Sequence, residues 1–336
     1  MWDPNFQTPG NGTKEALPPL LQARAKRSLY AALFGVASIP LLTALVQVLA
    51  VSVFELIVPE ITKSNVFLIL MSAIPMYLVA MPLSLLFFRL EKGDAPQTER
   101  RVSPLVLLGL LALSFAIAWA GNLVSTLINS VISRITGEPT VNETAKLMAE
   151  TPLWANLLVV GILAPILEEL FYRKLVIDRL RVFGDLAAVL LSGLLFGLIH
   201  GNFDQLFYAV GFGCMAGYLY LYTGKIRYTV ILHVVFNLIG GVFSSELARH
   251  LPGGTMPEDP FVLLEQTPWL FWCYEIYGMF TMACLAATPV VLVLLWKHIR
   301  FERREGDPTL MQTAGILIRH PATWTMLAVA ALLFVL

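Results

Sequence analysis

Residues 153–180 read LWANLLVVGILAPILEELFYRKLVIDRL, an apolar run interrupted by the acidic pair Glu168-Glu169 and ending in basic residues. A helix rises about 1.5 Å per residue, so this stretch is long enough to cross the ~30 Å hydrocarbon core of a bilayer. Ionisable side chains inside such a segment are costly and usually functional. The stretch therefore predicts a membrane-spanning helix that carries functional carboxylates.

The rest of the chain has the same apolar character. Hydrophobic residues fill 57% of the 336 positions and charged residues only 14%, whereas a soluble domain carries about 25% charged residues. Further apolar runs predict spans at 29–57, 66–88, 104–133, 186–201, 204–223, 228–246, 268–296 and 321–336. The predicted fold is all-α, a polytopic transmembrane bundle of about eight or nine helices.

Composition divides the chain into four regions. We expect a cytoplasmic N-terminal tail at 1–28, N-terminal transmembrane helices at 29–133, a core with buried polar residues at 150–245, and C-terminal transmembrane helices at 268–336. The tail lacks the short apolar region and the small-residue cleavage site of a signal peptide, so we expect the first span to remain as an anchor.

Basic residues indicate the orientation. If every predicted span crosses, all but four of the 23 Lys and Arg residues fall on one side of the membrane. The exceptions are Lys63, Arg134, Lys146 and Arg249. Cytoplasmic loops carry the excess of Lys and Arg, so we expect a cytoplasmic N-terminus.

Net charge and cysteine content argue against nucleic-acid binding and against a cysteine metal site. The formal net charge is +0, so no global field favours nucleic acid, and we expect none to bind. Cys214, Cys273 and Cys284 lie in or near apolar runs and form no C-x-x-C metal pattern. We interpret them as small buried apolar residues.

Helical spacing sorts the polar residues of the first motif. Glu169 and Arg173 are four residues apart, so they share a face and can pair. Glu168 is turned about 100° from Glu169 and is left without a partner close in sequence. This unpaired carboxylate is the candidate catalytic group.

Two further spans carry a polar pair each. Phe196 and His200 share a face in one, and His233 and Asn237 in another. Counted from the predicted turn near 182, Glu168 and His200 lie at roughly 20 and 21 Å along their helices, so they can sit at one depth. Gly201 predicts that the helix stops there, beside a water-accessible pocket. Tyr172 and Asn202 are interpreted as packing or pocket lining, and His320 as interfacial.

These groups suit hydrolysis. A carboxylate and a histidine at a wet pocket can activate water as a general base. A second histidine with an amide one turn later can donate hydrogen bonds to a developing oxyanion. The chain contains neither a G-x-S-x-G elbow nor an H-E-x-x-H helix, so acyl hydrolysis without a protein nucleophile is predicted.

The three motifs, Glu168-Glu169-x-x-x-Arg173, Phe196-x-x-x-His200 and His233-x-x-x-Asn237, resemble the signature of the CPBP intramembrane proteases, the CAAX-protease and bacteriocin-processing family. The resemblance covers roughly 150–245. It implies that Glu168 and His200 activate the attacking water and that His233 and Asn237 form the oxyanion hole. It implies that Glu169 and Arg173 hold the glutamate helix in place. A membrane-embedded or lipid-anchored protein or peptide is the implied substrate, and a bacterial cell membrane the implied location.

Alternatives remain at this stage. Glu168, His200 and His233 could bind zinc with an open fourth position, but we favour a metal-free site because Asn237 beside His233 suits an oxyanion hole better than a ligand set. An ion- or proton-coupled transporter would use similar buried groups, yet the sequence shows no paired interrupted helices in two halves. A non-catalytic peptide-immunity or scaffold protein is the third reading; here no motif residue is lost.

Overall fold

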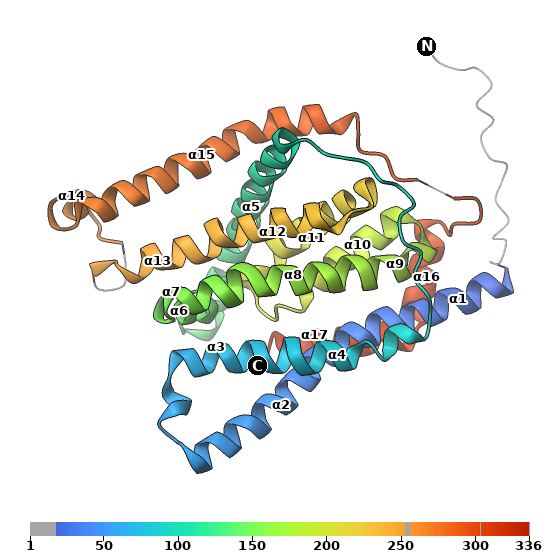
Figure 1. Cartoon of the computed structure of the whole chain (residues 1–336), viewed down its shortest axis with the longest axis horizontal. Coiled ribbons are helices and arrows are strands. Elements are labelled where there is room, and N and C mark those ends of the chain that lie inside the picture. Colours follow the sequence, from blue (N-terminus) through green and yellow to red (C-terminus); the bar gives the residue numbers. More distant parts are fainter. Residues whose placement is uncertain (1–17, 253–255, 303, 336) are drawn as a thin grey trace.

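The computed structural model describes residues 18–252, 256–302 and 304–335, and every regular element in these ranges is a helix (Figure 1). Within these ranges, seven helices are long and apolar enough to cross a membrane, and a bent pair raises the number to eight if it forms one span. The predicted polytopic helical bundle is thus confirmed. Most of the predicted 1–28 tail, residues 1–17, lies outside the described ranges.

Most candidate spans are composite helices. The first four are Pro19–Ile57 (α1 Pro19–Leu29, α2 Gly35–Ile57), Asn65–Arg89 (α3 Asn65–Ile74, α4 Met81–Ser84), Pro104–Thr136 (α5) and Leu153–Phe183 (α7 Leu153–Asn156, α8 Ala164–Glu169, α9 Asp178–Leu180). The other three are Phe203–Thr223 (α11), Ile226–Arg249 (α12 Ile226–Asn237, α13 Ser244–Arg249) and Pro268–Trp296 (α15). π-helical turns interrupt them at Tyr30–Phe34, Pro75–Ala80, Leu157–Leu163, Leu170–Ile177 and Leu238–Phe243.

Shorter helices complete the bundle: α6 (Glu143–Glu150), α10 (Asp185–Leu198), α14 (Phe261–Gln266), and the pair α16 (Leu310–Arg319) and α17 (Pro321–Leu333), bent by 76°. Single 3₁₀ turns lie at Ile61–Lys63, Phe87–Arg89 and Arg181–Phe183. The bend at Pro321 brings His320 against Tyr30, with ring centroids 4.4 Å apart, and leaves His320 only 5% exposed. His320, expected at the membrane interface, is thus covered by protein in the bundle.

The predicted helix stop after His200 is present. Helix α10 has 14 residues, which gives about 21 Å, less than the ~30 Å hydrocarbon core. Gly201 has a φ of +66°, which favours glycine, and the Asn202 side chain then caps α11 by accepting from the Gln205 N–H. This tight turn holds His200 inside the bundle.

Small residues let the central helices touch backbone to backbone. A Cβ on Gly213 of α11 would lie 2.9 Å from the Gly193 Cα of α10, and a Cβ on Gly121 of α5 would lie 2.5 Å from the Tyr208 N of α11. Helices in lipid associate through such close contacts because no hydrophobic effect drives them together. The resulting α5–α10–α11 layer supports one wall of the site.

The bundle has two chemically different ends (Figure 1). At the basic end, Arg24 pairs with Asp94 at 2.7 Å, Lys225 pairs with Glu99 at 3.3 Å, and α1, α9 and α16 meet. At the opposite end, where α6 and α7 lie, Arg249 donates to the Ala149 carbonyl at 3.0 Å. We use these two names for the ends below.

Candidate active site

One cavity of about 360 Å³ brings together the four residues that the sequence analysis proposed as catalytic. Glu168 comes from α8, His200 from the turn after α10, and His233 and Asn237 from α12. Three stretches separated in sequence thus contribute polar groups to one space inside an apolar bundle.

Glu169 and Arg173 form the ion pair that their spacing predicts. Arg173 Nε and Nη2 donate to the two Glu169 carboxylate oxygens at 2.8 and 2.9 Å, and both side chains are 0% exposed. Arg173 Nη1 also donates to the Gly213 carbonyl at 3.1 Å, which ties span four to α11. Since both charges are paired and hydrogen-bonded, the pair can be tolerated at this depth.

His233 is held by the same carboxylate. Its Nδ1 lies 3.1 Å from Glu169 Oε1, and its Nε2 lies 3.9 Å from Glu168 Oε2. The ring is buried and packs near Phe212, with centroids 4.8 Å apart. A carboxylate on Nδ1 fixes the orientation of an imidazole, so the Nε2 edge of His233 faces Glu168 and the cavity.

His200 is fixed by its own helix. Its Nδ1 lies 2.7 Å from the Phe196 carbonyl oxygen. A carbonyl only accepts, so Nδ1 carries a proton and Nε2 of a neutral ring is an acceptor. The Phe196 ring packs between the two histidines, 5.1 Å from His200 and 5.8 Å from His233, centroid to centroid. The motif Phe196-x-x-x-His200 thus places both a backbone acceptor and an aromatic spacer.

Glu168 has a partner that sequence reasoning missed. The hydroxyl of Tyr77 donates to Glu168 Oε1 at 2.7 Å, across 91 residues of sequence. Tyr77 lies in the π-helical turn Pro75–Ala80 of the second span and also lines the cavity. The only sequence signal was a hydroxyl within an apolar span that contains Pro75 and Pro82. Because Tyr77 holds Oε1, Oε2 is left on the His233 side.

Asn237 bridges two helices. Its amide Nδ2 donates to the Val160 carbonyl at 3.0 Å, which uses one of its two N–H groups. Val160 belongs to the π-helical turn Leu157–Leu163, and such turns are frequent at functional sites. Asn237 also lines the cavity.

Two residues interpreted as lining have distinct places. Tyr172 lines the cavity, and its buried hydroxyl has no hydrogen-bond partner within the described ranges. Asn202 Nδ2 donates to the His200 carbonyl at 2.9 Å. Tyr172 is therefore a possible contact for a bound peptide, and Asn202 shapes the turn that holds His200.

The comparison with known families can now be set against this geometry. Residues 150–239 match the family described as type II CAAX prenyl endopeptidase Rce1-like. The match agrees with the CPBP resemblance that the three motifs carry. It spans most of the expected 150–245 core and includes every motif residue. No curated protein and no solved structure matches the chain. At the level of the family, the match supports an intramembrane CAAX-type protease.

The motif residues include side chains that zinc commonly binds. Two histidines and a glutamate are a zinc-type donor set. Within the residues that the structure describes, however, no group of three or more His, Cys, Asp or Glu side chains is placed to hold a metal ion. The donors as they lie here are not arranged to hold zinc.

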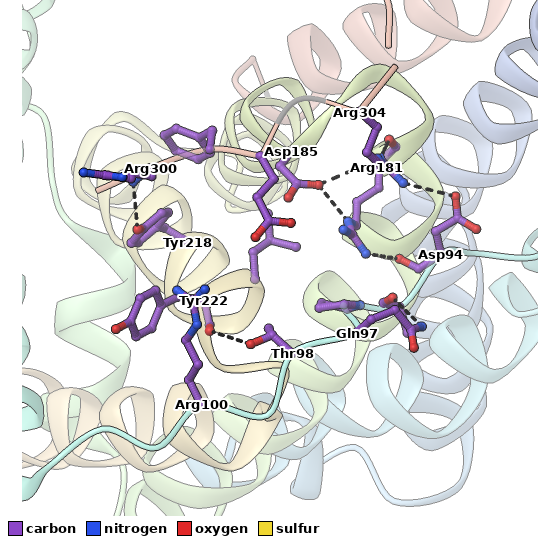
Figure 2. Close-up of a pocket in the computed structure, with 15 residues that line it drawn as sticks. Asp94, Gln97, Thr98, Arg100, Arg181, Asp185, Tyr218, Tyr222, Arg300 and Arg304 are labelled. Carbon is purple, nitrogen blue, oxygen red and sulfur yellow. Dashed lines mark hydrogen bonds and ion pairs between the residues drawn. The ribbon is translucent and has the colours of Figure 1, made fainter. Parts of the chain in front are cut away.

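A larger cavity, of about 480 Å³, lies at the basic end, remote from the CPBP motif residues (Figure 2). Arg181 Nε pairs with Asp185 Oδ1 at 2.8 Å and Nη1 donates to the Asp94 carbonyl at 2.8 Å. Arg304 lies 3.6 Å from Asp94 and 3.9 Å from Asp185. The acidic residues Asp94 and Asp185 are thus both engaged by arginines.

Proposed function

We propose that this protein is an intramembrane endopeptidase that hydrolyses a peptide bond of a membrane-embedded or lipid-anchored protein or peptide. One observation carries the proposal: a glutamate, two histidines and an asparagine converge on a single cavity in an apolar bundle, within the segment that matches a protease family.

The proposed nucleophile is a water molecule beside Glu168. Tyr77 holds Oε1, so Oε2 is the oxygen available to take a proton, and the acceptor Nε2 of His200 orients the same water. As the water oxygen bonds to the scissile carbonyl carbon, its proton passes to Glu168. The carboxyl then gives that proton to the leaving amine as the C–N bond breaks. A positioned base of this kind contributes about 10²–10⁴-fold to rate.

The proposed oxyanion hole is formed by His233 and Asn237. The free N–H of Asn237 can donate to the tetrahedral oxygen. His233 donates from Nε2 when both ring nitrogens carry protons, and the Glu168 and Glu169 carboxylates lie 3.9 and 3.1 Å from its ring nitrogens. Glu169 and Arg173 act as positioning residues, because they touch His233 and α11 rather than the cavity.

We further place the protein in a bacterial cell membrane with its N-terminus in the cytoplasm. The bacterial location follows the CPBP resemblance. The orientation follows the distribution of basic residues: if every predicted span crosses, the exceptions to a common side are Lys63, Arg134, Lys146 and Arg249. The ion pairs of the basic end gather the remaining connections in one place, as a single membrane face requires.

Purified protein in proteoliposomes, supplied with transmembrane peptides, tests the activity. Glu168→Ala and His200→Ala should each abolish cleavage while the thermal unfolding midpoint stays near that of wild type. Cleavage by Glu168→Ala at the wild-type rate would refute the mechanism. Proton or ion flux that disappears in these variants would instead identify a transporter. Loss of cleavage in a strong chelator, restored specifically by zinc, would replace the metal-free mechanism.

A further inference from the structure

The catalytic cavity extends from the middle of the bundle toward the opposite end. Beyond the polar groups, its walls include Ile69 and Ser72 from the first part of the span Asn65–Arg89, Val160 from the first part of span four, and Gln205 from the first turn of α11. The first two of these spans begin at the opposite end, where Asn65 Nδ2 also contacts the Glu150 carbonyl at 3.4 Å, and α11 begins at the Gly201 turn inside the bundle. The cavity therefore occupies the half of the bundle away from the basic end.

An exposed residue in the connection between α5 and α7 forms part of the rim of the catalytic cavity. Thr144 of α6 lines the cavity and is itself solvent-exposed. Helix α6 is fastened there from two sides: Asn156 Nδ2 donates to the Met148 carbonyl at 2.7 Å, and Arg249 donates to the Ala149 carbonyl at 3.0 Å. The cavity thus reaches the surface beneath a helix that is held in place.

Toward the basic end the cavity is closed. Arg173, Ile177 and Leu180, which follow Glu168 along span four, are each 0% exposed. Tyr220 of α11 is also 0% exposed, and its hydroxyl donates to Asp178 at 2.9 Å. This packed layer separates the catalytic cavity from the cavity of Figure 2, so a peptide cannot enter from that side without unpacking it.

We infer that the catalytic cavity is reached from the non-cytoplasmic face of the membrane. Its substrates are then membrane proteins or exported peptides whose scissile bond lies in, or just beyond, the outer half of the bilayer. The inference about substrates rests on the proposed function, whereas the accessibility of the cavity does not. The uneven distribution of Lys and Arg along the bundle gives the orientation in the membrane, since the basic end is the cytoplasmic one. The cavity opens at the end away from it.

Cysteine accessibility tests the direction without any substrate. In a background with Cys214, Cys273 and Cys284 replaced by alanine, Thr144→Cys reports the cavity rim and Gln97→Cys, exposed at the basic end, is the matched control. We expect a membrane-impermeant maleimide to label Thr144→Cys in intact spheroplasts and Gln97→Cys only after permeabilisation. The reverse pattern, or no labelling of Thr144→Cys, overturns the inference. If Thr144→Cys fails to fold, Ser72→Cys replaces it.

The position of cleaved bonds tests the substrate class. Membrane-protein termini that vanish in cells with Glu168→Ala should map to the outer half of the substrate's span or beyond it. Termini that vanish but map to cytoplasmic ends would overturn this inference and leave the protease intact. If no termini vanish, the protease function and its substrate class fail together, and labelling alone decides the direction of the cavity.

Discussion

The two cavities of this bundle differ in what their polar groups are free to do. The cavity at the basic end is larger, about 480 against 360 Å³, and richer in charge. Yet Arg181 and Arg304 there are engaged by Asp94 and Asp185 (Figure 2). In the candidate catalytic cavity, by contrast, Glu168, His200 and Asn237 each make one hydrogen bond within the bundle, and the proposed function uses their remaining polar atoms.

The contrast teaches that neither size nor charge alone selects the candidate active site. What distinguishes the catalytic cavity is a second layer of contacts, in which Arg173 neutralises Glu169 and Glu169 orients His233. In a preorganised site of this kind, the polar groups are already oriented in the folded protein, so no free energy is needed to reorient them during the reaction. The following predictions test whether this layer, and not the arginine cluster, supports activity.

The largest expected effect on stability comes from breaking the buried ion pair. Arg173→Ala leaves the Glu169 carboxylate at 0% exposure with His233 as its remaining ionisable partner, and removing one partner of such a pair costs about 3–5 kcal/mol. We expect a strongly lowered unfolding midpoint and loss of cleavage. Differential scanning fluorimetry in detergent measures the midpoint, and a midpoint equal to wild type would contradict the account.

The next effect concerns transition-state stabilisation. Asn237→Ala should lower kcat by about 10²-fold or more if its N–H contacts the oxyanion. The loss of its bond to the Val160 carbonyl should cost little stability, about 1 kcal/mol. If the yield of folded protein and the total cleavage activity fall by the same factor, Asn237 acts only as a structural bridge to Val160.

A smaller effect is expected at Tyr77. Tyr77→Phe removes only the hydroxyl that holds Glu168, a charge-assisted hydrogen bond worth about 1.5–3 kcal/mol, so we expect cleavage to fall by about tenfold. Tyr208→Phe is the matched control, because its hydroxyl lines the same cavity but accepts from Gln205 at 3.2 Å. Equal cleavage rates of the two variants would show that the Tyr77 hydroxyl does not position Glu168.

The smallest effect is expected at the basic end. The Arg304 side chain is 39% exposed, and ion pairs of such exposed groups contribute about 0–1 kcal/mol. Arg304→Gln should therefore leave the cleavage rate unchanged and shift the unfolding midpoint only slightly. A loss of cleavage comparable to that of Asn237→Ala would mean that the arginine cluster takes part in the reaction.

The sequence predicted what local geometry determines. The four-residue spacing of Glu169 and Arg173 anticipated their pairing, and the rise per residue anticipated that Glu168 and His200 reach one cavity. Contacts between distant spans were out of reach, such as Tyr77 with Glu168 and His233 with Glu169, because they depend on how whole helices are rotated and packed.

Element ends were also harder to predict than element types. The first helix begins at Pro19, earlier than the expected 29, since proline is tolerated in the first helical turn. The burial of His320 was also not predicted, because it depends on the sharp bend between α16 and α17 that packs its ring against Tyr30. The hydropathy of a segment is the same whether lipid or protein covers it, so hydropathy could not distinguish burial in lipid from burial in protein.

The most direct test of the central claim is a proteome-wide comparison of membrane-protein termini between cells with the wild-type protein and cells with Glu168→Ala, at matched expression. The account predicts that a defined set of internal termini, and their complementary fragments, disappears in the variant while Arg304→Gln retains them. An unchanged set of termini in Glu168→Ala cells would contradict the claim that Glu168 catalyses peptide-bond hydrolysis.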